Sequence, residues 1–244
     1  MKIPGAERAV LDLAKVRRRS APTSGPPDIT EHDMDELRRQ DVPYGNDWHS
    51  AEEAAAWAEE ADRRRPWRAQ IRDHIARRVA VLPTGARVLE LGSGPGFLAH
   101  RVMQSCPTLG GYTLLDFSEP MLALSRERLG MFPSASFVLA SFKSGDWPRH
   151  VGGPFDCILS MQAVHELRHK RHALRLYEQA YDVLAVPGSI MICDHTPFDD
   201  SSNSTALYMT ELEQQEALAG ARFANVRIEL RMDSLVVYAG ERDA

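Results

Sequence analysis

The sequence predicts an α/β protein built on a doubly wound, mostly parallel β-sheet. Three observations support this prediction. The 244 residues suffice for one large domain, and 43% of them are apolar and 26% charged, as in ordinary soluble proteins. Short apolar runs alternate with helical patterns beyond residue 85, as expected for parallel strands joined by crossover helices. A glycine-rich turn follows the first apolar run, where such sheets bind nucleotides.

Residues 1–43 are predicted to form a mobile arm. Its segment 20–30 combines three prolines with glycine and serine, a composition that suits a linker. The first twenty residues contain no continuous apolar stretch, which argues against a secretory signal. No apolar run approaches the roughly 18 residues that a membrane helix needs. The three cysteines form no C-x-x-C motif, so we expect a cytoplasmic protein without a membrane segment.

Residues 44–83 are predicted to form a helical cap. Ser50, with Glu53 three residues later, is a capping-box signature ahead of an alanine-rich stretch. A second helix is expected after Pro66, with one apolar face that must pack against other elements: Ile71, Ile75, Val79 and Leu82.

Two aromatic residues that precede the capped helix are candidates for a lid. Tyr44 and Trp48 carry large amphipathic rings, which commonly line ligand pockets. The alternative is that they only anchor the helices, the role that we favour for Trp57 and Trp67. The predicted lid would close over the ligand crevice of the sheet.

Residues 84–244 are predicted to form the sheet domain. The apolar runs that fit parallel strands lie at 86–91, 112–115, 135–140, 155–160 and 188–193. Apolar and charged residues then alternate over 226–231, and a second apolar run follows at 235–238. This ending predicts an antiparallel hairpin at the edge of the sheet.

The glycine-rich turn and one acidic residue indicate a nucleoside site. Glycines at 92, 94 and 96 let the backbone approach a ligand without interference from a Cβ atom. Asp116 lies twenty residues beyond Gly96, at the end of the second predicted strand, where a carboxylate can accept hydrogen bonds from ribose hydroxyls. The third glycine of a dinucleotide motif would fall at Phe97, so NAD is disfavoured.

These segments resemble the class I, Rossmann-like S-adenosylmethionine-dependent methyltransferases. The run E-x-G-x-G-x-G over 90–96 is similar to the first motif of that family, and Leu114–Leu122 is similar to the second. Residues 155–167 resemble the fourth strand and its exit, and 184–189 resemble the turn into the fifth. The resemblance covers roughly residues 80–240, and it implies a seven-stranded sheet with an antiparallel last strand and S-adenosylmethionine as cofactor.

The resemblance also implies roles for individual residues. The methionine end of the cofactor would lie against the glycine loop, Asp116 would hold the ribose, and Phe117 would border the adenine. Many relatives carry an aspartate after the third strand, whereas this chain has Ser141 and Phe142 there. The full set of candidate cofactor-binding residues is Glu90, Gly92, Ser93, Gly94, Gly96, Asp116, Phe117, Met121, Ser141, Phe142 and Met161.

Two histidines are candidates for catalysis. His165 and His195 follow the fourth and fifth predicted strands, whose carboxyl ends border the ligand crevice of a doubly wound sheet. A histidine titrates near neutral pH, so either could accept a proton from a substrate hydroxyl. The alternative is that both only line the pocket.

Residues 165–169 read H-E-L-R-H, which matches the H-E-x-x-H motif of zinc proteases. That motif needs two histidines on one helical turn and a third ligand, but the extended form would require a histidine at Arg175. We therefore treat zinc proteolysis as a remote alternative and predict no metal site.

The sequence thus favours methylation of a small-molecule acceptor. The formal net charge of -5 disfavours a nucleic-acid substrate, as does the absence of an Asn/Asp-Pro-Pro-aromatic motif at Ser160. The acidic ligand cluster of metal-assisted catechol methylation is also missing. An alternative of another class is a catalytically silent protein that binds S-adenosylmethionine for regulation, since such a protein could keep every glycine.

Overall fold

The computed structural model describes residues 40–243. The predicted arm therefore lies outside the described residues except for 40–43. Helices and strands follow in this order: α2 Ala51–Arg64, α3 Arg68–Val79, β1 Arg87–Leu91, α4 Phe97–Ser105, β2 Gly111–Asp116, α5 Glu119–Leu129, β3 Ala135–Leu139, α6 Pro148–Val151, β4 Phe155–Met161, the 3₁₀ helices η1 Val164–Leu167 and η2 Lys170–His172, α7 Ala173–Val183, β5 Leu184–His195, α8 Ser202–Leu207, α9 Glu211–Gly220, β6 Ala224–Met232 and β7 Leu235–Arg242.

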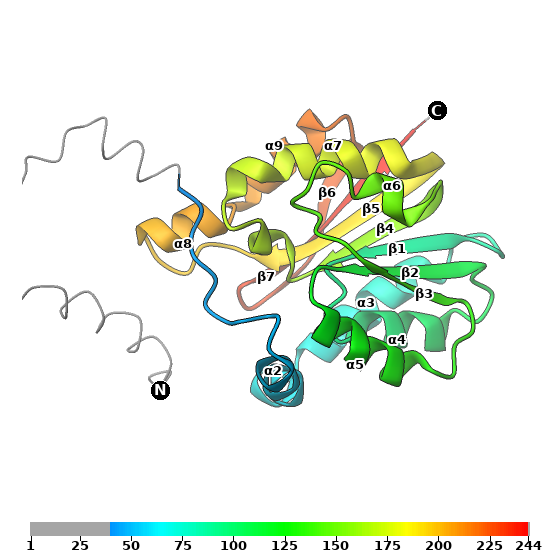
Figure 1. The fold of residues 1–244 in the computed structure, drawn as a ribbon. Helices are drawn as coiled ribbons and strands as arrows, with labels where there is room; N and C mark the ends of the chain where they lie inside the picture. Colours follow the sequence, from blue (N-terminus) through cyan, green and yellow to red (C-terminus); the bar gives the residue numbers. More distant parts are fainter. Residues whose placement is uncertain (1–39, 244) are drawn as a thin grey trace, which may run out of the picture. The chain divides into compact units, whose positions relative to one another are not determined.

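The strands form one seven-stranded sheet in the order β3-β2-β1-β4-β5-β7-β6, which confirms the predicted fold class (Figure 1). Strands β1 to β5 pair in parallel, whereas β7 pairs antiparallel with both β5 and β6. The chain reverses direction between β6 and β7 over residues 233–234, where the hairpin was predicted. Strand β5 starts at Leu184, earlier than the predicted residue 188.

Helices cover both faces of the sheet, as a doubly wound fold requires (Figure 1). On one face α3 and α4 enclose a buried cluster with apolar side chains of β1 and β2, and α7 and α9 cover the opposite face. Strands β1, β2 and β4 are buried on both sides, which explains why their sequences are apolar runs without alternation, whereas the edge strand β3 is only partly buried.

The region predicted as a helical cap contains α2 and α3. Ser50 accepts a hydrogen bond from the Glu53 amide at the start of α2, and Glu53 accepts one from the Asp47 amide. Ile71 and Ile75 of α3 are fully buried in the cluster shared with the sheet. The expected apolar stripe thus packs directly on the sheet, and a domain boundary at residue 84 stays a prediction.

None of the helices within residues 40–243 is long and apolar enough to cross a membrane. The three cysteines are buried free thiols.

Candidate active site

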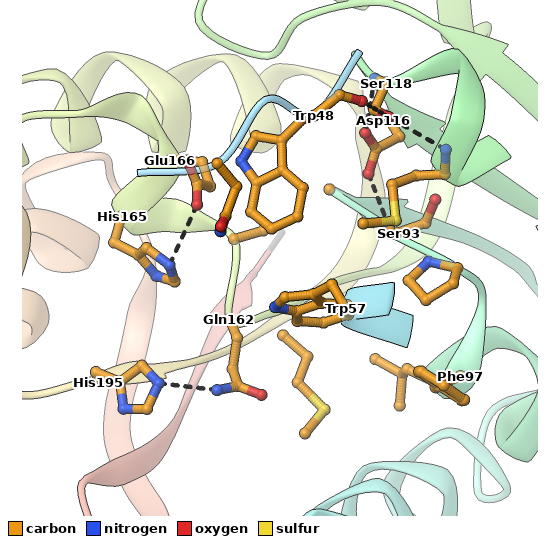
Figure 2. Close-up of a pocket in the computed structure, with 18 of the residues that line it drawn as sticks. Trp48, Trp57, Ser93, Phe97, Asp116, Ser118, Gln162, His165, Glu166 and His195 are labelled. Carbon is orange, nitrogen blue, oxygen red and sulfur yellow. Dashed lines mark hydrogen bonds and ion pairs between the residues drawn. The ribbon is translucent and has the colours of Figure 1, made fainter. Parts of the chain in front are cut away.

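A cavity of about 400 Å³ lies at the carboxyl ends of β1, β2, β4 and β5. Parallel sheets of this kind bind ligands at this edge, next to the point where the strand order reverses. Figure 2 shows Asp116 and Ser93 at one end of the pocket, His165 and His195 at the other, and Trp57 and Gln162 between them. We call the first end the cofactor half and the second end the acceptor half.

The glycine loop between β1 and α4 shapes the cofactor half. Gly92, Gly94 and Gly96 have φ of 67°, 53° and 77°, backbone conformations that favour glycine. A Cβ atom on Gly92 would lie 2.3 Å from Cβ of Ala163. Gly92 and Gly94 line the pocket, whereas Gly96 caps α4 beside Ser125. The structure therefore gives Gly96 a place in the turn and not on the pocket wall.

Asp116 is held firmly at the end of β2. Its carboxylate accepts hydrogen bonds from the Gly94 amide at 2.7 Å and the Ser118 amide at 2.9 Å. Burial raises the pKa of Asp116 to about 6, although these backbone hydrogen bonds oppose the rise. The carboxylate oxygens keep lone pairs that can accept from two vicinal hydroxyl groups, as a ribose requires.

Glu90 and Ser93 line the same half. Glu90 is 2% exposed and accepts a hydrogen bond from the Tyr112 hydroxyl at 2.7 Å. Burial raises the pKa of Glu90 to about 8. The hydrogen bond from Tyr112 opposes this rise, and the negative charge of Asp116 adds to it. The Ser93 hydroxyl is buried with no hydrogen-bond partner in residues 40–243. A polar ligand in this half would supply that partner, so the residues present fit an adenosyl amino acid.

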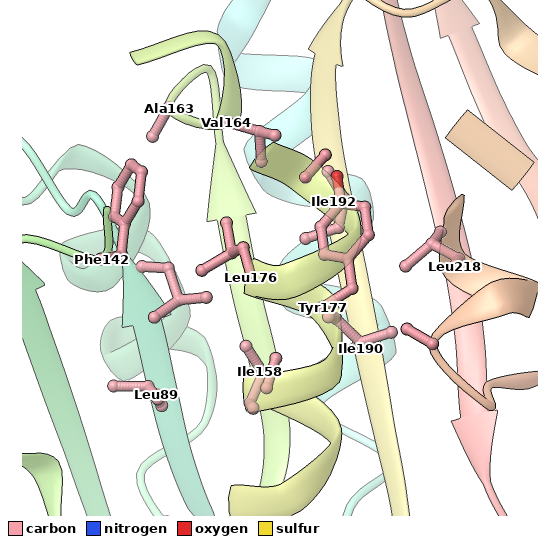
Figure 3. Packing of buried hydrophobic residues seen from close by; sticks show 14 of the residues in the cluster. Leu89, Phe142, Ile158, Ala163, Val164, Leu176, Tyr177, Ile190, Ile192 and Leu218 are labelled. Carbon is pink, nitrogen blue, oxygen red and sulfur yellow. The ribbon is translucent and has the colours of Figure 1, made fainter. Parts of the chain in front are cut away.

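The expected adenine contacts are only partly assembled. Phe117, Met121, Phe142 and Met161 line the pocket. Figure 3 shows Phe142 beside Ala163 at the edge of a buried apolar cluster, so its ring joins the pocket wall to the core. Ser141 is not among the lining residues; its hydroxyl accepts from the Lys143 amide.

His165 forms a hydrogen-bonded pair with Asp194 in the acceptor half. Its Nδ1 lies 2.7 Å from Oδ1 of Asp194, and its backbone amide donates to Oδ2 at 3.0 Å. Burial disfavours the charged imidazole, but the Asp194 carboxylate outweighs this effect and the pKa of His165 is raised. Nδ1–H donates to Asp194, so Nε2 is the nitrogen that can contact a ligand, and Oε1 of Glu166 lies 3.6 Å from it.

His195 is set up differently. Its Nδ1 lies 2.8 Å from the Ser234 hydroxyl, and its Nε2 lies 2.8 Å from the Gln162 amide and 3.2 Å from the Arg65 guanidinium. Since Gln162 nitrogen and Arg65 can only donate, Nε2 is an acceptor and the ring is neutral. Burial lowers the pKa of His195 to about 3, and the nearby positive charges of His165 and Arg65 add to this effect.

The H-E-x-x-H segment does not form the helix that a zinc protease uses. Residues 164–167 form a 3₁₀ helix that ends at Arg168 with φ of 66°, and His169 caps the next 3₁₀ helix. His165 and His169 therefore do not share an α-helical turn. The described part of the chain contains no cluster of histidine, cysteine and acidic side chains that could hold a metal.

Residues 40–50 run along the pocket as a strap. Trp48 lines the pocket, and its carbonyl accepts from the Ser118 hydroxyl. Tyr44 lies outside the main pocket and stacks near Phe117, with ring centroids 5.9 Å apart. Arg168 holds the strap, because its guanidinium donates to the carbonyls of Val42 and Pro43.

Several lining residues were not expected. Trp57 lines the pocket, although an anchoring role was favoured for it. Gln162 has a left-handed φ of 58°, which no sequence pattern indicates. Tyr208 packs against both histidines, with its ring centroid 5.3 Å from that of His165 and 5.7 Å from that of His195. It comes from the connection between β5 and α9.

Comparisons with known proteins agree with this geometry. Residues 88–188 match the family model of a methyltransferase domain. The chain is 32% identical to a malonyl-[acyl-carrier protein] O-methyltransferase of Magnetococcus marinus over 40% of this chain and 37% of that protein. It is 29% identical to a ubiquinone/menaquinone biosynthesis C-methyltransferase of Edwardsiella ictaluri over 45% of this chain and 43% of that protein. The matches thus span less than half of these curated relatives.

Solved structures share the fold. PigF with SAH superposes with a TM-score of 0.65 at 15% identity, over 86% of this chain and 69% of that chain. Human N-acetylserotonin methyltransferase in complex with SAM gives a TM-score of 0.64 at 14% identity, over 86% of this chain and 65% of that chain. Residues 88–188 thus match a methyltransferase domain, and the strand order and the glycine loop are those that the resemblance to the class I, Rossmann-like S-adenosylmethionine-dependent methyltransferases implies.

Proposed function

We propose that this protein transfers the methyl group of S-adenosylmethionine to a small-molecule acceptor, with His165 as the general base. The observation that carries the proposal is that one pocket joins the glycine loop and Asp116 to the pair formed by His165 and Asp194. Bound cofactor would supply an electrophilic methyl group on its sulfonium.

In the cofactor half, the protein would bind S-adenosylmethionine and orient it. Asp116 would accept hydrogen bonds from the ribose hydroxyls while its own backbone bonds keep the carboxylate in place. The Ser93 hydroxyl would gain its missing partner, and Glu90 would lie at the amino-acid end. A positive charge placed beside Glu90 would favour its ionised form.

In the acceptor half, His165 would remove a proton. Asp194 fixes the imidazole with Nδ1–H toward the carboxylate, so Nε2 can take the proton of an acceptor hydroxyl while the acceptor oxygen gains the methyl group. The protonated ring would be stabilised by the Asp194 charge. His195, neutral and fixed by Gln162, would position the acceptor rather than take its proton.

The rings around this half support a small acceptor. Trp48, Trp57 and Tyr208 give the pocket aromatic walls, which suit a compact organic molecule better than a nucleic acid. We also propose that the protein works in the cytoplasm without a nucleic-acid partner, which the free thiols and the net charge of -5 support. A silent binding protein would not need the buried pair of His165 and Asp194.

His165→Gln tests the proposal. Titration with S-adenosylhomocysteine should give nearly the same affinity in both proteins, whereas turnover in an acceptor screen should fall about 10²- to 10⁴-fold because the base is lost. His150→Gln, on the exposed helix α6, is the matched control and should leave both quantities unchanged. Failure of the wild-type protein to bind S-adenosylhomocysteine would refute the cofactor assignment, and unchanged turnover in His165→Gln would refute the base.

A further inference from the structure

Four arginines line the pocket: Arg65, Arg68, Arg72 and Arg168. Two of them are neutralised by acids. Arg72 forms two hydrogen bonds with the Asp62 carboxylate, at 2.6 and 2.9 Å. Arg168 pairs with Glu166 at 3.2 Å.

Arg65 and Arg68 are not neutralised in this way. No carboxylate of residues 40–243 forms an ion pair with either of them. Arg68 is only 7% exposed; one of its terminal nitrogens donates to the Ala61 carbonyl at 3.0 Å, while its buried Nε has no hydrogen-bond partner in the described residues. Arg65 donates to the neutral His195 ring.

Such an arrangement is costly unless a ligand completes it. A buried cation without an anionic partner loses its hydration and gains no ion pair in return. Burial lowers the pKa of Arg68 to about 10, and the charge of Arg65 contributes, but the group still carries its charge at neutral pH. The pocket therefore contains positive charge that an anion would compensate.

The contacts of Arg65 place this positive charge in the acceptor half. Arg65 and the Gln162 amide both donate toward Nε2 of His195. The His195 ring lies beside Phe198 and Tyr208, with centroids 5.1 and 5.7 Å away. Donors to an anion and aromatic walls are thus combined on the side of the pocket away from Asp116.

We propose that Arg65 and Arg68 bind a carboxylate carried by the methyl acceptor. The inference rests on the proposed function and adds the chemical class of its substrate, a small aromatic hydroxy acid. The planar fork of a guanidinium matches the two oxygens of a carboxylate. The ring centroids of His165 and His195 lie 6.0 Å apart, so one compact molecule can reach both the base and the arginines.

A matched pair of probes tests the proposal without methyl transfer. In the full chain saturated with S-adenosylhomocysteine, 4-hydroxybenzoate should bind about tenfold or more tightly than 4-hydroxybenzamide, which has the same shape without the charge. Arg65→Gln with Arg68→Met should abolish this preference. Arg65→Gln alone should reduce the preference for the acid several-fold. Arg65 is partly exposed, so this substitution should not prevent folding.

Arg64→Gln is the control, because Arg64 is an exposed neighbour on α2 that pairs with Glu60. It should leave the preference unchanged. Equal binding of the two probes, or no measurable binding of the acid to the wild-type protein, would overturn the proposal.

The cofactor also carries a carboxylate, and a second measurement separates the two sources. The double variant should bind S-adenosylhomocysteine within about threefold of the wild-type affinity. If that affinity falls tenfold or more while 5′-methylthioadenosine, which lacks the amino-acid part, binds as before, the arginines serve the cofactor and the proposal is wrong. Because neither measurement needs turnover, failure here is distinguishable from failure of the methyltransferase assignment.

Discussion

The two halves of the pocket are built by different means. In the cofactor half, glycine backbone and one carboxylate held by two amides form the wall, all within residues 90–121. In the acceptor half, side chains from the residue after α2, from η1, from β5 and from the connection after it meet through hydrogen bonds and ring contacts. The first half presents a fixed backbone surface, whereas the second depends on which side chains are neighbours.

This difference appears most clearly in the two histidines. Their rings lie 6.0 Å apart, yet the pKa of His165 is raised and that of His195 falls to about 3. Both are largely shielded from solvent, so burial alone cannot account for the opposite directions. His165 has the direct carboxylate partner, and His195 faces two donors. Identical residue types thus acquire distinct chemistry from their partners.

The largest effect should come from Asp194→Asn in the acceptor half. Loss of the carboxylate removes the charge that stabilises protonated His165, so turnover should fall about 10²-fold or more. In the wild-type protein the rate should rise with pH through a value above 6.5, where His165 loses its proton. In Asp194→Asn this rising limb of the pH profile should move to lower pH, because burial, which lowers the pKa of His165, is then no longer offset by the Asp194 carboxylate.

A pH profile of kcat/KM measures this shift, and Ser234→Ala is its control. Ser234 contacts His195 and not His165, so the limb should stay in place. An unmoved limb in Asp194→Asn would show that His165 is not the group that titrates.

A smaller effect is expected from Asp116→Ala in the cofactor half. Affinity for S-adenosylhomocysteine should fall by about 1.5 to 3 kcal/mol, the range for hydrogen bonds to a charged group. Calorimetry measures the change. Ser141→Ala, at a residue outside the pocket wall, should leave the affinity as it is. Equal losses in the two variants would contradict the division of roles between Asp116 and Ser141.

The smallest effect should follow Asp41→Asn in the strap. Asp41 pairs with Lys143, Arg171 and His172. Burial alone would raise its pKa, but Lys143 and His172 lower it to about 2. The folded-state pKa is depressed, so this stabilisation is present above about pH 4 and is lost as the pH falls through about 2.

At pH 7 the free energy of unfolding should therefore drop by about 1 kcal/mol or less in Asp41→Asn, after allowance for solvent screening. Denaturant titration checks the value. The loss should disappear near pH 2, and a loss that persists there would mean that the ion pairs are not its cause.

Sequence reasoning predicted the fold, and it named most residues that line the cofactor half, because both depend on local patterns. The strand runs and the 90–96 loop are contiguous, so periodicity and spacing reveal them. Ser141 was expected in the pocket from its position after β3, but its hydroxyl accepts a hydrogen bond from the Lys143 amide in the same turn. Gly96 was expected there too, yet its left-handed φ serves the start of α4.

The acceptor half was predicted only in part. His165 and His195 could be placed because they follow strands. Arg65 follows Arg63 and Arg64 in the sequence, and nothing local distinguishes the one residue of the three that reaches His195. Tyr208 belongs to a connection whose path depends on how α9 packs. Contacts between distant segments leave no periodic trace in a sequence.

The connection 196–210 has a consequence for engineering. It starts directly after His195 of β5 and ends directly before Glu211 of α9, so regular structure fixes both ends, and it carries Phe198, Leu207 and Tyr208 to the pocket. A replacement segment of equal length would join the same two ends, which β5 and α9 hold in place. Libraries built on these residues can therefore redesign acceptor choice while the glycine loop and Asp116 keep their sequence.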